Sequence, residues 1–269
     1  MKYILILLSL LVSSQAPAWD QAFPYPLEQC NAQAPYGFAQ TSKQVVPICR
    51  KAYVSYNDTA AKIPVWVSYT LTPDHALGCV PRPNAFAPDA SLQKGARAEL
   101  ADYAKSGYDI GHVAPYGVMD WDLQTGYESF LLTNMLPQLP GLNRASWKIL
   151  ETSVKGWALQ LGHTFVVYTG PIYDASDKTI GDSKVVVPHA FYKIVIDANT
   201  NQVAGFLFPH SAGLGNDLTT LRAPLTQISQ LTGITFAYPA NAVELPFDQL
   251  WPVDFGAIIK AKQVKCKSN

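Results

Sequence analysis

Three polar residues in the middle of the chain have the types and the spacing to act together in one reaction. His112 lies in "YDIGHVAPYG", residues 108–117. At about 100° per residue, the segment 143–161 projects as a helix whose apolar stripe consists of Trp147, Leu150, Val154, Trp157, Ala158 and Leu161. Asn143 falls on that stripe and Glu151 at its border. Because burying an unpaired polar group costs about 1–3 kcal/mol, this amide and this carboxylate indicate a function.

An amide oxygen and a carboxylate on one helix face suit a hard cation such as Mg²⁺, which prefers oxygen ligands and keeps several of its waters. Asn143 would bind the ion directly, and Glu151 would hold a metal-bound water. His112, opposite the ion, would deprotonate a second water for in-line attack on a phosphodiester. Asn143 could equally cap the helix, because asparagine is a favoured N-cap residue, but a cap leaves Glu151 unexplained.

The elements that must position these residues are predicted to be strands and a few helices. Alternating or β-branched runs predict strands at 51–57, 63–71, 164–173 and 185–197, and "DANTNQ" predicts a hairpin turn into "VAGFLFP". Helices are expected at 94–105, 143–161 and 217–230. Since these elements do not follow a βαβ order, the expected fold class is α+β, with a central antiparallel sheet flanked by helices. The proline-rich segment 238–253 is expected to be an ordered surface loop.

The N-terminus has the features of a secretory signal peptide. Lys2 precedes an apolar run that is too short to span a bilayer, and Ala16-Pro17-Ala18 fits an A-x-A cleavage site. We therefore expect residues 1–18 to be removed, and the protein to be periplasmic or extracellular with no membrane span. Residues 19–269 are expected to form a single domain that begins with an irregular arm at 19–44.

The chain carries 20 basic and 20 acidic residues, and 48% of its residues are hydrophobic. A neutral total argues against a protein that coats nucleic acid by bulk charge, although a local basic cleft remains compatible with it. The basic tail "KAKQVKCKSN" is expected to be a solvated terminus. Four histidines lack a context comparable to that of His112: His75, His163, His189 and His210.

Four cysteines remain after cleavage of the signal peptide: Cys30, Cys49, Cys79 and Cys266. An even number in an exported chain predicts two disulfides, for which three connectivities exist. We favour Cys30–Cys49 as a local loop and Cys79–Cys266 as a tie to the tail, although the sequence leaves the pairing open. The absence of C-x-x-C and of a His/Cys cluster at zinc spacing argues against a structural zinc site.

Three ordered segments resemble the motifs of a known family. They are "SGYDIGHVAP" (106–115), "ESFLLTNMLPQ" (128–138) and "LNRASWKILE" (142–151). Together they are similar to the DNA/RNA non-specific endonucleases of the ββα-metal, or His-finger, superfamily, which includes endonuclease G. The resemblance runs from about Tyr53 to about Pro209. It implies a ββα-metal finger active site, DNA and RNA as substrates, and Mg²⁺ as the cofactor, with Mn²⁺ as the alternative ion.

The resemblance also implies roles for single residues. His112 matches the general base, Asn143 the metal ligand and Glu151 the residue that orients metal-bound water. Arg82, in "PRPNAFAPD", matches an arginine that contacts the phosphate near the scissile bond. Asn134 matches a position that supports the site, and we group it with the substrate-binding residues.

The first motif departs from the family pattern at one place. It implies that Asp109 shapes the turn before the histidine and that Gly111 permits close backbone packing. Between them the family has an arginine, where this chain has Ile110. Isoleucine offers phosphate no charge, and the lost contact would weaken transition-state binding by about 1–3 kcal/mol. Arg144 or Arg97 would have to supply the missing charge.

The main hypothesis is therefore an exported, Mg²⁺-dependent, sugar-non-specific endonuclease. Because of Ile110, one alternative is a catalytically impaired homologue that binds nucleic acid with the same fold. A second alternative, an exported carbohydrate-binding protein or hydrolase, rests only on an aromatic content of 12%. That hydrolase would require a facing pair of catalytic carboxylates, and the sequence offers no convincing pair.

Overall fold

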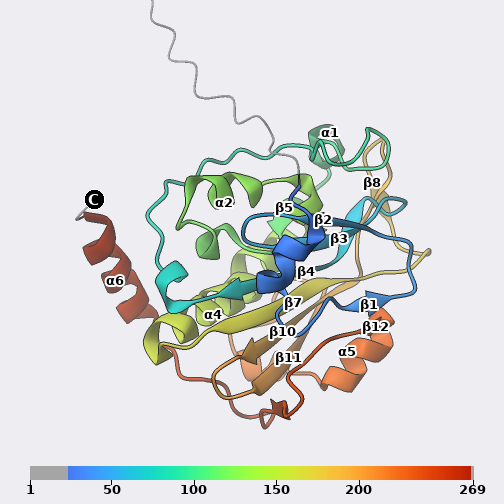
Figure 1. Cartoon of the computed structure of the whole chain (residues 1–269). Helices are drawn as coiled ribbons and strands as arrows, with labels where there is room; N and C mark the ends of the chain where they lie inside the picture. Colours follow the sequence, from blue (N-terminus) through green and yellow to red (C-terminus); the bar gives the residue numbers. More distant parts are fainter. Residues whose placement is uncertain (1–23, 268–269) are drawn as a thin grey trace, which may run out of the picture.

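The computed structural model describes residues 24–267, so the predicted signal peptide lies outside the described residues. A seven-stranded sheet forms the centre of the molecule (Figure 1), and its neighbouring strands are antiparallel except for β11 and β13. In spatial order the strands are β13 (Val243–Glu244), β11 (Gln202–Pro209), β10 (Ala190–Asp197), β7 (Phe165–Ile172), β4 (Ile63–Leu71), β3 (Val54–Asp58) and β2 (Val46–Cys49). The expected α+β class with a central antiparallel sheet is confirmed.

The predicted strands form where β-branched and aromatic residues alternate. The range 63–71 is reproduced as β4, and the hairpin through "DANTNQ" joins β10 to β11. The run at 185–197 divides into β9 and β10, with Pro188 between them, because proline cannot donate to a strand ladder. Two small sheets lie apart from the main one: β1 (Gln40–Thr41) with β12 (Ile234–Thr235), and β8 (Thr179–Ile180) with β9 (Val185–Val186).

One hydrophobic core lies on each face of the sheet. Helix α4 (Lys148–Leu161) covers one face and α5 (Leu225–Thr232) the other (Figure 1). The apolar stripe predicted for 143–161 is confirmed, because Trp147, Leu150, Val154, Trp157 and Ala158 are buried and Leu161 packs against the same core. The other α-helices are α1 (Leu100–Tyr103), α2 (Leu123–Glu128), α3 (Pro140–Leu142) and α6 (Phe255–Lys267). Short 3₁₀ turns occur at η1 (Leu27–Gln33), η2 (Pro73–His75), η3 (Tyr116–Val118), η4 (Leu132–Asn134) and η6 (Leu218–Leu221).

All three predicted helices differ from their expected ranges. The range 143–161 starts with the π-helical turn η5 (Asn143–Trp147), in which Ala145 has a non-helical φ of −117° and ψ of −112°, and only Lys148–Leu161 form the regular helix α4. The range 94–105 contains only the four residues of α1, since Gly95 has a positive φ of 92° and interrupts the segment. The range 217–230 is divided into η6 and α5 because Pro224 disfavours helical geometry at the residue before it.

The C-terminal region is more ordered than the sequence predicts. Within 238–253, β13 joins the main sheet, and Trp251 is buried, with its ring centroid 5.0 Å from that of Trp157. Residues 260–267 of the basic tail, expected to be a solvated terminus, form the end of α6 (Figure 1). The favoured disulfides Cys30–Cys49 and Cys79–Cys266 are both present, and the second ties α6 to the loop after η2. Among the described residues, no helix has the length and apolarity needed to cross a membrane.

A ββα unit carries the residues singled out in the sequence. Strand β5 (Asp109–His112) pairs antiparallel with β6 (Met135–Gln138), and the π-helical turn η5 (Asn143–Trp147) leads into α4. Gly111 permits this pairing, because a Cβ there would lie 2.0 Å from Gln138 Oε1.

Candidate active site

Strand β5, the turn η5 and α4 border a cavity of about 560 Å³. Five of the predicted site residues line it: Arg82, His112, Asn143, Arg144 and Glu151. Ile110 lies in its wall, together with two lysines from α4, Lys148 and Lys155. The cavity therefore gathers four cationic side chains and one carboxylate, which favours a phosphate-bearing ligand.

His112 is held as a neutral imidazole at the end of β5. Its ring meets the Phe130 ring edge-on, with centroids 4.8 Å apart, and its carbonyl oxygen accepts a 3.2 Å hydrogen bond from Trp147 Nε1. Its Nε2 is buried and has no hydrogen-bond partner within residues 24–267. Burial, with a smaller contribution from Arg82, lowers the pKa of His112 to about 3. The imidazole is therefore neutral at physiological pH and can accept a proton.

Asp109 organises the start of the helix. Its Oδ2 accepts hydrogen bonds from Asn143 Nδ2 at 2.9 Å and Arg144 Nε at 2.8 Å, and its Oδ1 accepts one from Arg144 Nη2 at 2.6 Å. Burial alone would raise the pKa of Asp109, but these contacts hold it below its usual value. Asp109, expected to shape a turn, thus connects β5 to the helix. The N-cap of η5 is Leu142, and within residues 24–267 the Asn143 side chain bonds only through its Nδ2 to Asp109, so its amide oxygen remains available as an acceptor.

Glu151 lies in the first turn of α4, after the π-helical turn that contains Asn143, and lines the same cavity. Its Oε1 is buried without a hydrogen-bond partner in the part of the chain that the structure describes. Burial raises the pKa of Glu151 to about 7, while Lys193 and Arg82 act in the opposite direction. Both the unpaired buried carboxylate oxygen of Glu151 and the free amide oxygen of Asn143 can bind a hard cation directly or accept a hydrogen bond from one of its waters. The residues therefore fit Mg²⁺.

Arg82 lies at the rim of the cavity. Its guanidinium is over the rings of Phe130 and Tyr116, 4.8 and 5.3 Å from their centroids, and its Nε donates to Asn84 Oδ1 at 2.8 Å. Cation–π contact and a single side-chain hydrogen bond orient the guanidinium while leaving donors for a ligand.

Asn134 cannot bind substrate directly, which corrects its grouping with the substrate-binding residues. It is fully buried, and its amide donates to Ala114 O and Ser129 O and accepts from Ala114 N at 2.8 Å. These bonds fix the backbone two residues after His112, so Asn134 supports the finger.

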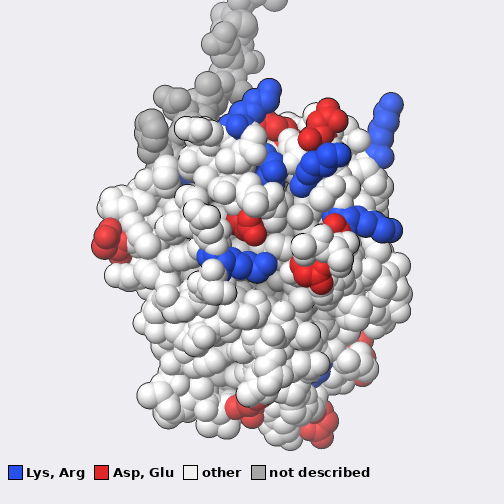
Figure 2. All heavy atoms as spheres, turned by 90° about the vertical axis from the view of Figure 1, so that its right-hand side faces the viewer, with Lys and Arg blue, Asp and Glu red and all other residues white. Residues whose placement is uncertain are grey.

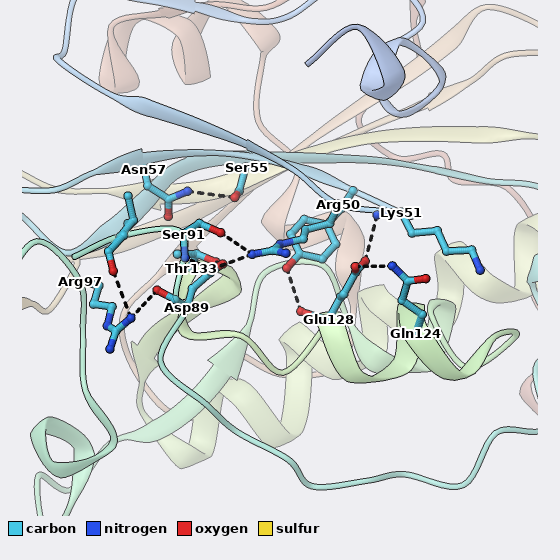
Figure 3. A network of polar contacts seen from close by, with 12 residues as sticks. Arg50, Lys51, Ser55, Asn57, Asp89, Ser91, Arg97, Gln124, Glu128 and Thr133 are labelled. Atoms are coloured by element: carbon cyan, nitrogen blue, oxygen red, sulfur yellow. Dashed lines mark hydrogen bonds and ion pairs between the residues drawn. The ribbon is translucent and has the colours of Figure 1, made fainter. Parts of the chain in front are cut away.

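Arg97 belongs to a different part of the molecule (Figure 3). Its Nη1 donates to the carbonyl oxygens of Asp89 and Leu92, and its Nε pairs with Glu99 at 3.0 Å. Asp89 in turn pairs with the buried Arg50 at 2.6 Å. Because its donors bind this framework outside the cavity, Arg97 is not the cation that replaces the missing family arginine, and Arg144 is the candidate that remains.

Two lysines that the sequence analysis did not single out also approach the site. Lys155 lies one turn after Glu151 on α4, and its ammonium donates to Gly117 O at 2.7 Å and lies 3.8 Å from Asp120. Lys193 is fully buried in β10. The sequence signal for the second was a single lysine inside the apolar run "AFYKIVID", where the strand period places it on a core face.

A second group of potential ligands lies elsewhere. Ligand atoms of Asp174, Asp177 and His189 are within 4.8 Å of one another. His189 Nδ1 contacts Asp177 at 2.9 Å, and Asp174 Oδ1 accepts from Ser176, so hydrogen bonds within the group account for its geometry.

Comparison with known proteins establishes the family. The model of the DNA/RNA non-specific endonuclease family matches residues 31–242. The chain belongs to this family.

Individual members of the DNA/RNA non-specific endonuclease family are similar over most of the chain. A nuclease of Nostoc sp. is 32% identical over 68% of this chain and 69% of its own length. The Serratia marcescens nuclease is 29% identical over 86% of this chain and 87% of its own length. Human mitochondrial endonuclease G is 29% identical over 70% of this chain and 68% of its own length. A chain in the crystal structure of the EndoG/EndoGI complex superposes with a TM-score of 0.69 at 27% identity, covering 82% of this chain and 92% of that one.

Membership of the DNA/RNA non-specific endonuclease family makes the chain an endonuclease, a hydrolase of phosphodiester bonds. The carbohydrate-related alternative is thereby set aside. Neutral overall charge agrees with a local binding site: on the face in Figure 2, Lys and Arg are interspersed with Asp and Glu in the upper part, and most of the lower part is uncharged.

Proposed function

We propose that this protein is an exported, Mg²⁺-dependent endonuclease that cleaves DNA and RNA without sequence preference, with His112 as general base and Asn143 as metal ligand. The observation that carries the proposal is that His112 and Glu151 line one cavity together with four cationic side chains, while each has a buried polar atom without a hydrogen-bond partner in residues 24–267. Such atoms are costly to bury unless a ligand uses them.

In this mechanism the neutral imidazole of His112 takes a proton from the attacking water. Arg82 and Arg144 bind the non-bridging oxygens of the phosphodiester. Asn143 would hold Mg²⁺ and Glu151 would orient its waters, and the ion, when bound, would stabilise charge on the leaving oxygen. None of these groups reads a base edge, so recognition depends on the phosphate backbone and not on sequence.

Export and a single domain over residues 19–269 are part of the proposal. The disulfides Cys30–Cys49 and Cys79–Cys266 support export, because such bonds persist in oxidising compartments such as the periplasm or the extracellular space. Two cores that share one sheet support the single domain.

The test is incubation of purified residues 19–269 with supercoiled plasmid and with RNA, in Mg²⁺ or in EDTA. The proposal expects both substrates to be degraded in Mg²⁺ and to remain intact in EDTA. Salt-dependent binding of intact substrate at high protein concentration would instead support the impaired homologue.

The Mg²⁺ requirement should depend on pH through Glu151. With a pKa of about 7, its carboxyl is protonated in more acidic solution, whereas His112, at about 3, stays neutral. The Mg²⁺ concentration for half-maximal cleavage should therefore rise as the pH falls from about 8 to about 5.5. Metal titrations at both pH values, with Glu151→Gln as control, measure this. A rise of the same size in Glu151→Gln would assign the effect to another group.

Arg144, and not residue 110, should supply the phosphate contact. Ile110 packs partly against the core, while the Arg144 side chain is 71% exposed and lines the cavity. Arg144→Ala should slow cleavage about ten- to a hundredfold, and Ile110→Arg should change it less. Rates at two salt concentrations check this, since the loss from Arg144→Ala should shrink at high salt. A large gain from Ile110→Arg would show that the missing family charge limits the rate.

A further inference from the structure

A buried charge lies on the central sheet and contacts residues next to the active site. Lys193 alternates with Phe191 and Val195 on the β10 face that packs against α4, and it is fully buried there. No carboxylate of residues 24–267 lies within ion-pair distance of its ammonium. Burial lowers the pKa of Lys193 to about 8, so the group is still largely charged at pH 7.

The contacts of the ammonium connect three elements of the site. Its Nζ donates to Thr169 Oγ1 at 3.0 Å, the residue opposite it on β7, and to Val113 O at 3.4 Å. It also lies 4.1 Å from the centroid of the Trp147 ring. Val113 directly follows His112, and Trp147 Nε1 donates to His112 O. The charge therefore contacts the backbone just after the base and the side chain that holds the base from the helix.

We propose that Lys193 is a positioning residue of the nuclease site, whose buried ammonium fixes the His112 backbone relative to α4. This assignment rests on the proposed function, because it concerns the same reaction. The charge also opposes the effect of burial on the pKa of Glu151. Lys193 does not line the cavity, so it acts through His112 and Trp147 and not on substrate.

The free-energy cost of burying a charge distinguishes a positioning role of Lys193 from a role in stability alone. Desolvating an ammonium costs several kcal/mol, and replacing a buried charge by a well-packed apolar side chain is often neutral or stabilising. A lysine kept only for stability would therefore be a poor choice at this position. Misplacing a catalytic group by about 1 Å, in contrast, can slow a reaction about a hundredfold.

The experiment compares Lys193→Met with the wild-type protein in steady-state cleavage of an oligonucleotide and in thermal unfolding. Methionine preserves the length of the side chain and removes the charge. We expect kcat to fall about ten- to a hundredfold with KM changed less than about threefold, and Tm to be unchanged or higher. Tyr192→Phe is the matched control, since it removes a buried polar group of the same strand that faces the other core and should leave kcat unchanged.

Two results would overturn the assignment. One is a kcat of Lys193→Met within about threefold of wild type. The other is a Tm lowered by more than about 5 °C, which would mark Lys193 as structural. An inactive wild-type protein would contradict the proposed function itself, so the two failures are distinguishable.

Discussion

His112→Ala should reduce kcat about 10²- to 10⁴-fold while the fold and Mg²⁺ binding persist, because it removes the base and no metal ligand. The side chain packs edge-on against Phe130 and makes no side-chain hydrogen bond with the described residues, so its loss breaks no network. Steady-state rates on plasmid, with thermal unfolding as the check on folding, measure this.

The matched control for His112→Ala is His189→Ala, which removes an exposed histidine that lies outside the cavity. Its cleavage rate should equal that of wild type. If His112→Ala also kept near-normal rates, the assignment of the general base would be wrong.

Asn143→Ala should raise the Mg²⁺ concentration for half-maximal cleavage by about ten- to a hundredfold, as expected for loss of a ligand from a site with few protein donors. Rates measured over a Mg²⁺ titration test this. Arg144→Ala is the control, since it removes the neighbouring contact to Asp109 but leaves the amide in place.

If Asn143 were only a helix cap, its replacement would lower the free energy of unfolding by about 1 kcal/mol and leave the Mg²⁺ requirement unchanged. That outcome would contradict a metal-ligand role. The helical φ and ψ of Asn143, −57° and −41°, and the position of Leu142 as the N-cap of η5 already argue against capping.

Local patterns in the sequence predicted part of the site. Helical periodicity placed Asn143 and Glu151 on one face, and both line the same cavity, although the structure divides the segment into η5 and α4 with non-helical φ and ψ at Ala145. His112 could be placed opposite them only through its motif, since nothing local relates β5 to α4. Strand β4 was predicted over its full length because most of its residues are β-branched or aromatic.

Contacts between distant segments explain what the sequence could not supply. The sequence alone does not distinguish Arg97 from Arg144. In the structure Arg97 donates to the carbonyl oxygens of Asp89 and Leu92, whereas Arg144 pairs with the Asp109 side chain. Lys193 and Val113 are 80 positions apart in the sequence, and only the packing of the sheet brings them into contact. Two contacts attach the C-terminal helix to the rest of the molecule: the disulfide Cys79–Cys266 and the ion pair between Lys262 and Asp120 at 2.5 Å.

A crystal structure of the His112→Ala protein with Mg²⁺ and a short oligonucleotide tests the central claim most directly. We predict Mg²⁺ on the amide oxygen of Asn143, with a phosphodiester beside it in the cavity and in contact with Arg82. A phosphodiester bound outside this cavity, or Mg²⁺ found only at Asp174, Asp177 and His189, would contradict the account.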